Sequence, residues 1–269
     1  MSLVPTVKRR IRRLGGKGEE LLQRVLATVG FAQSDSQISA DSQKYWNDTR
    51  GERWRSDSHW HDASVFASDD LWSRIGRTHL ELFQRGARTV QFDRPWNRVV
   101  EWGCGGGANA VHFGKLAGEF VGVDISQETI DECERRVAEH ADTPFRGVLI
   151  EVAEPERAVA EIGTCDVFLC FYVFELIPSP EYGERLLKIA RDVLAPGGVA
   201  LIQIKYDEGR FWTRSRRRAY RRSVAEMTTY PIAEFWQLAQ RCGLRPETIE
   251  LVPKNELDER YAYFLLSRP

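Results

Sequence analysis

The sequence predicts an α/β fold: a doubly wound, mostly parallel seven-stranded sheet with an antiparallel edge strand and a helical N-terminal extension. Three observations favour it. From residue 98 onward, short apolar strands alternate with helical segments, as in the βα units of a parallel sheet. Residues 166–173 form a continuous apolar run, as expected for a strand that is buried on both faces. A glycine-rich turn stands between the first strand and its helix.

The elements of this domain follow one another in a regular order. A helix is expected over residues 69–88, because acidic residues stand in its first turn and apolar residues recur along one face. The strands expected from the apolar runs are 99–102, 120–124, 148–152, 166–173 and 199–204. The helices expected between them are 108–116, 126–139 with Ser126 as its cap, and 179–194 with proline at its first position.

The regular alternation stops at residues 207–230, a segment that is rich in arginine. A helix is expected over residues 231–242, because Gly243 is a natural C-terminal cap. Two strands, 248–252 and 260–267, are then expected to close the chain as an antiparallel edge pair.

Residues 1–68 are expected to form a helical arm followed by an aromatic-rich lid. The arm begins with six basic residues between Lys8 and Lys17 and continues into an apolar stripe at helical spacing, from Leu21 to Val29. We expect the arm to pack on the domain, and contact with an anionic membrane or partner is the alternative. Residues 33–68 are polar and irregular but carry five aromatic side chains, so we expect them to pack as a lid.

The composition argues against several classes of protein. The formal net charge of −1 gives no general attraction for nucleic acid, so any such attraction has to come from local clusters. Five cysteines without a CxxC pair predict neither a disulfide framework nor a structural zinc site, and they favour a cytoplasmic location. No apolar stretch has the roughly 18–20 residues that span a bilayer, so no transmembrane segment is expected.

The sharpest signal is the run Glu101-Trp-Gly103-Cys-Gly105-Gly-Gly107 between a strand and a helix. Glycine lets the backbone turn tightly and approach a ligand closely, because no Cβ stands in the way. Asp124 ends the next strand, where a carboxylate can accept hydrogen bonds from both ribose hydroxyls of a nucleoside. Loop, strand and terminal acid together predict a cofactor that contains a nucleoside.

Two classes of cofactor compete for this loop. The spacing of Gly103, Gly105 and Ala108 also satisfies the dinucleotide fingerprint, so a dehydrogenase that binds NAD is an alternative. However, Glu101 would repel a pyrophosphate and would attract a cofactor with a cationic amino group and a sulfonium.

Four motifs in order resemble those of the class I S-adenosylmethionine-dependent methyltransferases. They are VVEWGCGGGANAVHF (99–113), FVGVDIS (120–126), CDVFLCFYVFELIP (165–178) and LLKIARDVLAPGGVALIQ (186–203). The resemblance covers about residues 70–269 and implies a Rossmann-like methyltransferase domain over 69–269, with an insertion at about 205–230. The implied cofactor is S-adenosyl-L-methionine.

The resemblance also implies roles for single residues. Glu101 and the loop around Gly103 and Gly105 would hold the methionine portion, Asp124 the ribose hydroxyls, and Ile125 the adenine face. The other residues expected at the cofactor are Cys104 and Asn109 in and after the loop, Val152 and Ala153 at the adenine edge, Cys170 and Phe171 near the methyl group, and Tyr45 and Trp46 as an aromatic pair that closes over it.

His59 and His61, in the lid, are the candidates for a general base, which would help a hydroxyl acceptor to react. The alternative is that both are exposed loop histidines. An HxH pair could also suggest a metal, but no carboxylate set accompanies it, so no metal is expected. His79 and His112 are expected to be structural, and His140 to be exposed.

Six arginines between Arg214 and Arg222 leave three interpretations open: a solvated helix face, recognition of an anionic acceptor, or contact with nucleic acid. The function that the sequence favours is O-methylation of a small molecule or glycan. An RNA methyltransferase and a non-catalytic module that binds the cofactor are the alternatives. The acceptor itself stays open.

Overall fold

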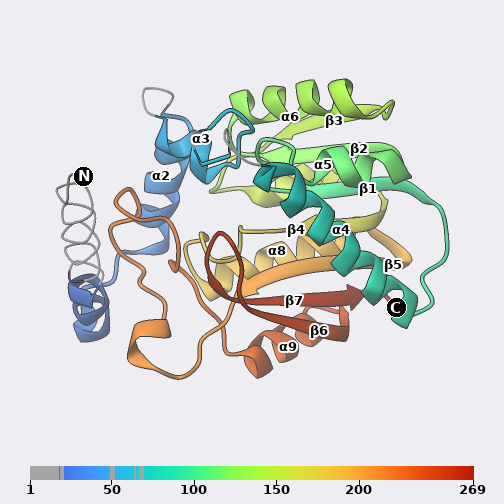
Figure 1. Cartoon of the computed structure of the whole chain (residues 1–269). Coiled ribbons are helices and arrows are strands. Elements are labelled where there is room, and N and C mark those ends of the chain that lie inside the picture. The colour runs from blue at the N-terminus through green and yellow to red at the C-terminus, as the bar shows by residue number, and fades with distance from the viewer. Residues whose placement is uncertain (1–17, 19–20, 49–51, 64, 67–69) are drawn as a thin grey trace, which may run out of the picture.

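In the computed structural model of the chain, a seven-stranded sheet has the order β3-β2-β1-β4-β5-β7-β6 (Figure 1). The strands are β1 Trp96–Trp102, β2 Ala117–Asp124, β3 Phe145–Leu149, β4 Cys165–Cys170, β5 Leu194–Lys205, β6 Arg245–Lys254 and β7 Glu259–Ser267. The first five strands pair in parallel, and β7 runs antiparallel to both β5 and β6. The predicted fold class is confirmed.

The structure describes residues 18, 21–48, 52–63, 65–66 and 70–269. The basic cluster predicted between Lys8 and Lys17, and the predicted start of a helix at Asp69, lie outside these described residues.

Helices cover both faces of the sheet and build one apolar layer on each side. The α-helices of the described residues are α2 Asp35–Trp46, α3 Arg53–Asp57, α4 Leu71–Thr89, α5 Ala110–Phe113, α6 Gln127–His140, α7 Ala158–Ile162, α8 Pro180–Val193 and α9 Ile232–Arg241. Side chains of α4, α5 and α6 share one buried cluster, which includes Phe83 and Phe113. Side chains of α7, α8 and α9 share the other. All six residues of β4 are buried between these layers, which explains its continuous apolar sequence.

The helix starts follow the capping rules that predicted them. The Ser126 hydroxyl accepts a hydrogen bond from the backbone N–H of Thr129, and that of Ser179 accepts one from Tyr182 with Pro180 at the first helical position. The first two predicted strands begin earlier than expected, and 148–152 is wrong in its second half because β3 ends at Leu149.

The lid, which the sequence predicts to be irregular, contains a helix. Ser34 and Gln37 form a capping box, in which each side chain bonds the other residue's backbone N–H, and they start α2. The pattern S-x-x-Q was present in the sequence, but the polar composition of the segment hid the helix behind it.

The insertion is the second departure. Apart from the short turn η4 (Phe211–Thr213), its described residues between 207 and 230 are irregular, so the arginines do not form a helix face. A single bridge pairs Tyr206 with Tyr230 at the base of the insertion.

The N-terminal arm contacts the domain differently from what its pattern predicts. Residues 21–26 are helical and continue into a π-helical turn, η1 Ala27–Phe31. The apolar side chains of Leu21, Leu22 and Val25 are exposed, whereas Arg24 is buried and donates to Glu226 and to the carbonyl of Arg214. The arm therefore packs through its arginine and not through its apolar stripe.

Candidate functional site

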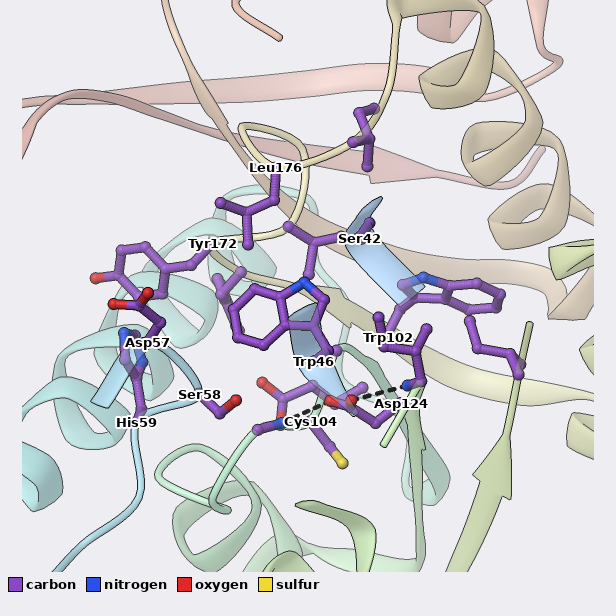
Figure 2. A pocket seen from close by; sticks show the side chains of 18 of the residues that line it. Ser42, Trp46, Asp57, Ser58, His59, Trp102, Cys104, Asp124, Tyr172 and Leu176 are labelled. Carbon is purple, nitrogen blue, oxygen red and sulfur yellow. Dashed lines mark hydrogen bonds between the residues drawn. The ribbon is translucent and has the colours of Figure 1, made fainter. Parts of the chain in front are cut away.

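A cavity of about 890 Å³, counted to its open mouth, lies at the carboxyl ends of β1, β2 and β4 (Figure 2). The strand order turns back between β1 and β4, which is the place where open α/β sheets bind ligands. Residues of α2 and of the lid complete its wall, among them Ser42, Trp46 and residues 57–59.

The glycine loop lines the floor of this cavity in a conformation that suits glycine. Gly103 and Gly105 have φ of 74° and 52°, in the left-handed region. A Cβ on Gly103 would lie 2.4 Å from Cγ2 of Val173, and one on Gly105 would lie 2.7 Å from the carbonyl oxygen of Ser58. Both conformation and space therefore require glycine here.

Glu101 is a buried carboxylate that is only half satisfied. Its Oε1 accepts a hydrogen bond of 2.6 Å from Asn109 Nδ2, but its buried Oε2 has no partner among the described residues. Burial raises its pKa to about 8, with the charge of Asp124 adding to the shift and the Asn109 bond opposing it. A cation in the cavity would pair with this oxygen and favour its ionised form.

Asn109 and His79 hold Glu101 in place. Because Asn109 donates to Glu101, its Oδ1 is left to accept from Nδ1 of His79, 2.8 Å away. Burial lowers the pKa of His79 to about 4, so the ring is neutral and its Nε2 is free to accept from the hydroxyl of Tyr263 at 3.2 Å. His79 is thus a structural residue, as predicted, and it orients a residue of the cavity.

Asp124 stands at the end of β2, on the other side of the glycine loop. Its Oδ1 accepts from the backbone of Ile125 and Ser126 at 2.8 and 3.2 Å, and its Oδ2 accepts from Gly105 at 3.3 Å. Burial raises its pKa to about 6 although these bonds oppose the shift. The carboxylate is therefore mostly ionised at neutral pH, and two oxygens have capacity for further donors.

Most of the residues expected at the cofactor lie around the cavity. Those that line it are Trp46, Glu101, Gly103, Cys104, Gly105, Asn109, Asp124, Ile125, Val152 and Phe171. The backbone N–H of Val152 already donates to the side chain of Gln43, at 3.0 Å.

Three of the expected residues lie elsewhere. Cys170 is the last residue of β4 and its side chain is in the apolar cluster beneath, because alternate strand residues face opposite sides. Ala153 is exposed and lines a neighbouring groove. Tyr45 stands behind the wall, where its hydroxyl donates to Asp57 and its ring contacts Trp46 edge-on at 5.0 Å.

The two histidine candidates separate. His59 lines the cavity in a left-handed conformation, φ 55°, with its ring edge-on to Tyr172 at 4.9 Å and to Phe66 at 5.3 Å. Burial lowers its pKa to about 4, so its ring is neutral. His61 is exposed and packs against the edge of Trp72, outside the cavity lining. Figure 2 shows Asp57, His59 and Tyr172 on one side of the cavity and Asp124 on the other.

Two backbone carbonyls of the lid accept hydrogen bonds, one from the glycine loop and one from α4. The carbonyl of Ser58 accepts from the N–H of Gly106 at 2.7 Å, and that of His59 accepts from Trp72 Nε1 at 2.8 Å. These bonds fix the strained turn that carries His59. Asp57 and Ser58 were missed from the sequence, although they stand beside the histidine that was singled out.

The wall formed by α2 depends on a residue of the insertion. The hydroxyl oxygen of Tyr220 accepts from Trp46 Nε1 at 2.9 Å and from the hydroxyl of Ser42 at 3.1 Å. All three line the cavity and are buried. Nothing in the sequence pairs Tyr220 with a helix more than 170 residues earlier, so this contact had no local signal.

The arginine side chains of the insertion do not line the cavity, although Tyr220 of the same segment does. Arg216 is buried and donates to the carbonyls of Ser223 and Ala225, Arg217 pairs with Asp35, and Arg218 donates to Gln23. No lysine or arginine of the described chain lines the cavity, whereas three carboxylates do, those of Asp57, Glu101 and Asp124. Recognition of an anionic acceptor, one of the three interpretations left open for these arginines, has no support in this geometry.

A family model described as "Methyltransferase domain" matches residues 99–198, which contain the glycine loop, Asp124, β4 and the PGG turn. Residues 99–198 therefore carry a methyltransferase domain of the class I S-adenosylmethionine-dependent type. The chain is 28% identical over 107 residues to the ubiquinone biosynthesis O-methyltransferase of Burkholderia thailandensis, a match that covers 39% of this chain and 42% of that relative.

Other relatives are matched over more of their length. The ubiquinone biosynthesis O-methyltransferase of Ralstonia nicotianae is 25% identical over 175 residues, 61% of this chain and 70% of the relative. The crystal structure of magnesium protoporphyrin IX methyltransferase from Synechocystis, with bound S-adenosylhomocysteine, superposes with a TM-score of 0.60 at 14% identity, covering 86% of this chain and 99% of that one. This likeness shows a shared fold.

The described ranges lack two further features. They contain no group of three or more histidine, cysteine, aspartate or glutamate side chains that could hold a metal ion. They also contain no helix that is long and apolar enough to cross a bilayer.

Proposed function

We propose that this protein binds S-adenosylmethionine in the cavity and transfers its methyl group to a hydroxyl oxygen of a small molecule. The observation that carries the proposal is the buried, unpartnered Oε2 of Glu101 beside the glycine loop. An unpaired carboxylate oxygen is costly to bury, and a cationic ligand would offset that cost. The names of the curated relatives, which are O-methyltransferases, support oxygen as the acceptor atom.

The cavity residues fit the parts of this cofactor. Glu101 would face the amino group and the backbone around Gly103 and Gly105 the methionine portion. Asp124 would accept from the ribose hydroxyls, and Ile125 and Val152 would flank the adenine. Bound there, the cofactor supplies a methyl carbon that its sulfonium has already activated for in-line displacement.

The rest of the cavity favours an acceptor that is neutral and partly apolar. Its walls include Tyr172, Val173, Leu176 and Ile177, and no cationic side chain of the described residues lines it. A cavity wall that contains carboxylates but no cation would repel an anionic group. We therefore propose a small uncharged hydroxyl compound rather than an anionic molecule or a glycan phosphate.

His59 is the residue we propose as the general base. Its neutral ring would accept the hydroxyl proton of the acceptor as the acceptor oxygen takes the methyl group that the bound cofactor would supply. The edge contacts with Tyr172 and Phe66 would hold the imidazole in position. The proton would then pass to solvent through the open mouth of the cavity.

The test compares two histidine variants. His59→Ala is expected to lower kcat by about 10²-fold or more, because a positioned base contributes about 10²–10⁴-fold. His61→Ala is the matched control, since it removes an exposed ring two residues away, and it should stay within about threefold of the parent. Cofactor affinity of both variants is measured by calorimetric titration.

The outcomes distinguish the parts of the proposal. If His59→Ala binds the cofactor normally and keeps its kcat within about tenfold, His59 is not the base and the preference for oxygen is withdrawn. If the parent itself shows no heat of binding with S-adenosylmethionine, the cofactor assignment fails.

The five free, buried cysteines support the cytoplasmic location that the sequence predicts.

A further inference from the structure

The helix at the start of the described chain has its polarity inverted. Leu21, Leu22 and Val25 in the helix are exposed over 52%, 55% and 42% of their surface, and Val29 and Phe31, at and beyond the break at Val29 and Gly30, over 61% each. Arg24, in the same turn as Leu21 and Leu22, is only 5% exposed. A helix of a water-soluble protein normally places these residues the other way round.

Buried charges lock this orientation. Arg24 donates to the carboxylate of Glu226 and to the carbonyl of Arg214. Glu226 in turn pairs with Arg260 and lies 3.7 Å from Nζ of Lys205, which is itself buried. Rotating the helix to bury its apolar stripe would break both of these bonds of Arg24 and would remove one of the three cationic partners of Glu226. The stripe is therefore held outward.

The surroundings of the stripe carry positive charge. The insertion that receives Arg24 presents Arg214 and Arg221 at the surface, and it carries Trp212 with 61% of its surface exposed. In the sequence, six lysines and arginines between Lys8 and Lys17, outside the described residues, and then Glu19 and Glu20 precede the helix. In Figure 1 the helix and the insertion lie on the same side of the molecule. Apolar side chains flanked by arginine and tryptophan are typical of helices that lie in a membrane interface.

We propose that residues 21–31, together with the adjoining face of the insertion, dock on an anionic lipid bilayer. The stripe would enter the boundary between headgroups and acyl chains, and the arginines would meet lipid phosphates. A second copy of the chain fits this face less well, because a two-fold contact would set the basic segments of both copies against each other. The proposal goes beyond the methyl transfer proposed above and does not depend on it.

The placement has a consequence for the cavity. The helix leads through residues 32–34 directly into α2, whose Ser42 and Trp46 form part of the cavity wall. A docked protein would therefore hold that wall close to the lipid, and an apolar acceptor could reach the cavity from the bilayer.

The test uses the full chain and flotation with vesicles. Binding is expected to phosphatidylcholine vesicles that contain phosphatidylglycerol, to weaken as salt rises, and to be much weaker with phosphatidylcholine alone. The double variant Leu22→Glu, Val29→Glu should weaken binding at least about tenfold, because two charges would enter the apolar boundary. Leu116→Glu is the matched control, a change at a residue of similar exposure far from the stripe in the sequence, and should bind like the parent.

Charge is tested separately with Arg214→Gln, Arg221→Gln, which should lower affinity and flatten the salt dependence while the unfolding temperature stays the same. Thermal unfolding of each variant shows that it is folded. Equal vesicle binding by the parent and the folded Leu22→Glu, Val29→Glu variant would overturn the proposal. Absence of binding to anionic vesicles at low salt would also overturn it. If in that case the parent is a dimer and the Leu22→Glu, Val29→Glu variant is a monomer, the face is an interface between two copies of the chain.

Discussion

Glu101 is the buried side chain whose charge state is expected to control cofactor binding. In the free protein burial raises its pKa to about 8, so at neutral pH most molecules carry a protonated Glu101. The bound cofactor's cation would stabilise the ionised form, which lowers the pKa in the complex. Binding must therefore release a proton from Glu101 whenever the pH lies below about 8.

This coupling predicts the pH dependence of cofactor affinity. Between pH 6 and pH 8 affinity for S-adenosylmethionine should rise with pH, by up to about tenfold per unit, and then level off near the free pKa. Asp124, with a pKa near 6, adds a contribution of the same sign at the lower end. Titration calorimetry in buffers of different ionisation enthalpy measures both the affinity and the proton released.

The matched control is Glu101→Gln, which keeps the shape and the contact with Asn109 but cannot ionise. Its affinity should be weaker, and the part of the slope that belongs to Glu101 should disappear. A slope that is unchanged in this variant would assign the proton to another group and would remove Glu101 from the site.

Asp124 is the second residue whose loss should be felt in binding. Asp124→Ala is expected to weaken cofactor affinity by about 1.5–3 kcal/mol, the range for hydrogen bonds to a charged group. Asp124→Asn keeps an acceptor for the N–H groups of Ile125 and Ser126, so comparing the two variants separates contact with the ligand from support of the loop. Affinity of Asp124→Ala equal to that of the parent would contradict a role at the ribose.

At the scale of elements, the cavity wall joins parts of the chain that no strand or helix connects. α2 is fastened to the insertion through Tyr220, and the lid is fastened to the glycine loop through the carbonyl of Ser58. The same insertion is tied to β5 and β7, because Glu226 pairs with both Arg260 and Lys205. Burial would lower the pKa of Lys205, but the carboxylates of Glu175, Glu226 and Asp258 raise it above its ordinary value.

Tyr220→Phe tests the bond between α2 and the insertion. The change removes one oxygen and leaves the indole N–H of Trp46 and the hydroxyl of Ser42 buried without that acceptor, at a cost of about 1–3 kcal/mol in unfolding free energy. Because α2 forms part of the cavity wall, KM for the cofactor should rise more than kcat falls. Chemical denaturation and steady-state kinetics measure the two effects, and a variant with unchanged stability and KM would show that the bond does not hold the wall.

At the scale of the whole molecule, the buried Glu101 of the site lowers the free energy of unfolding of the unliganded protein above pH 4.5. The pKa of the Glu101 carboxyl rises from about 4.5 in the unfolded chain to about 8 in the folded protein. The free energy of unfolding therefore falls as pH rises between these two values, because the unfolded chain releases this proton more readily. Stability conferred by the protonated group is fully present below pH 4.5 and is lost progressively as pH rises to about 8. The unliganded protein should therefore be less stable at pH 8 than its packing alone would allow.

Glu101→Gln should accordingly raise the unfolding temperature of the unliganded protein at pH 8, by at least about 3 °C, since about 1 kcal/mol moves the midpoint by 2–4 °C at this size. The difference from the parent should shrink at pH 5, where Glu101 is protonated in the folded state. Differential scanning calorimetry at the two pH values decides it. A variant that unfolds at a lower temperature than the parent at pH 8 would contradict this account of Glu101.

The order of the elements, the glycine loop, Glu101 and Asp124 could all be predicted from the sequence. Each is encoded locally: apolar runs mark buried strands, serine and proline mark helix starts, and a glycine turn between strand and helix has few other uses. Asp124 follows from its place at a strand end, because the carboxyl ends of parallel strands meet at one edge of the sheet.

The wall of the cavity could not be predicted in this way, because it depends on contacts between irregular segments far apart in the chain. Trp46 and Tyr220 are 174 residues apart, and Arg24 and Glu226 are 202 apart. No periodicity relates such pairs. Only the tertiary structure places His59 in the cavity and His61 outside it. It also turns the apolar stripe of the first helix outward, because a buried arginine needs a carboxylate partner more strongly than a few apolar side chains need to be buried.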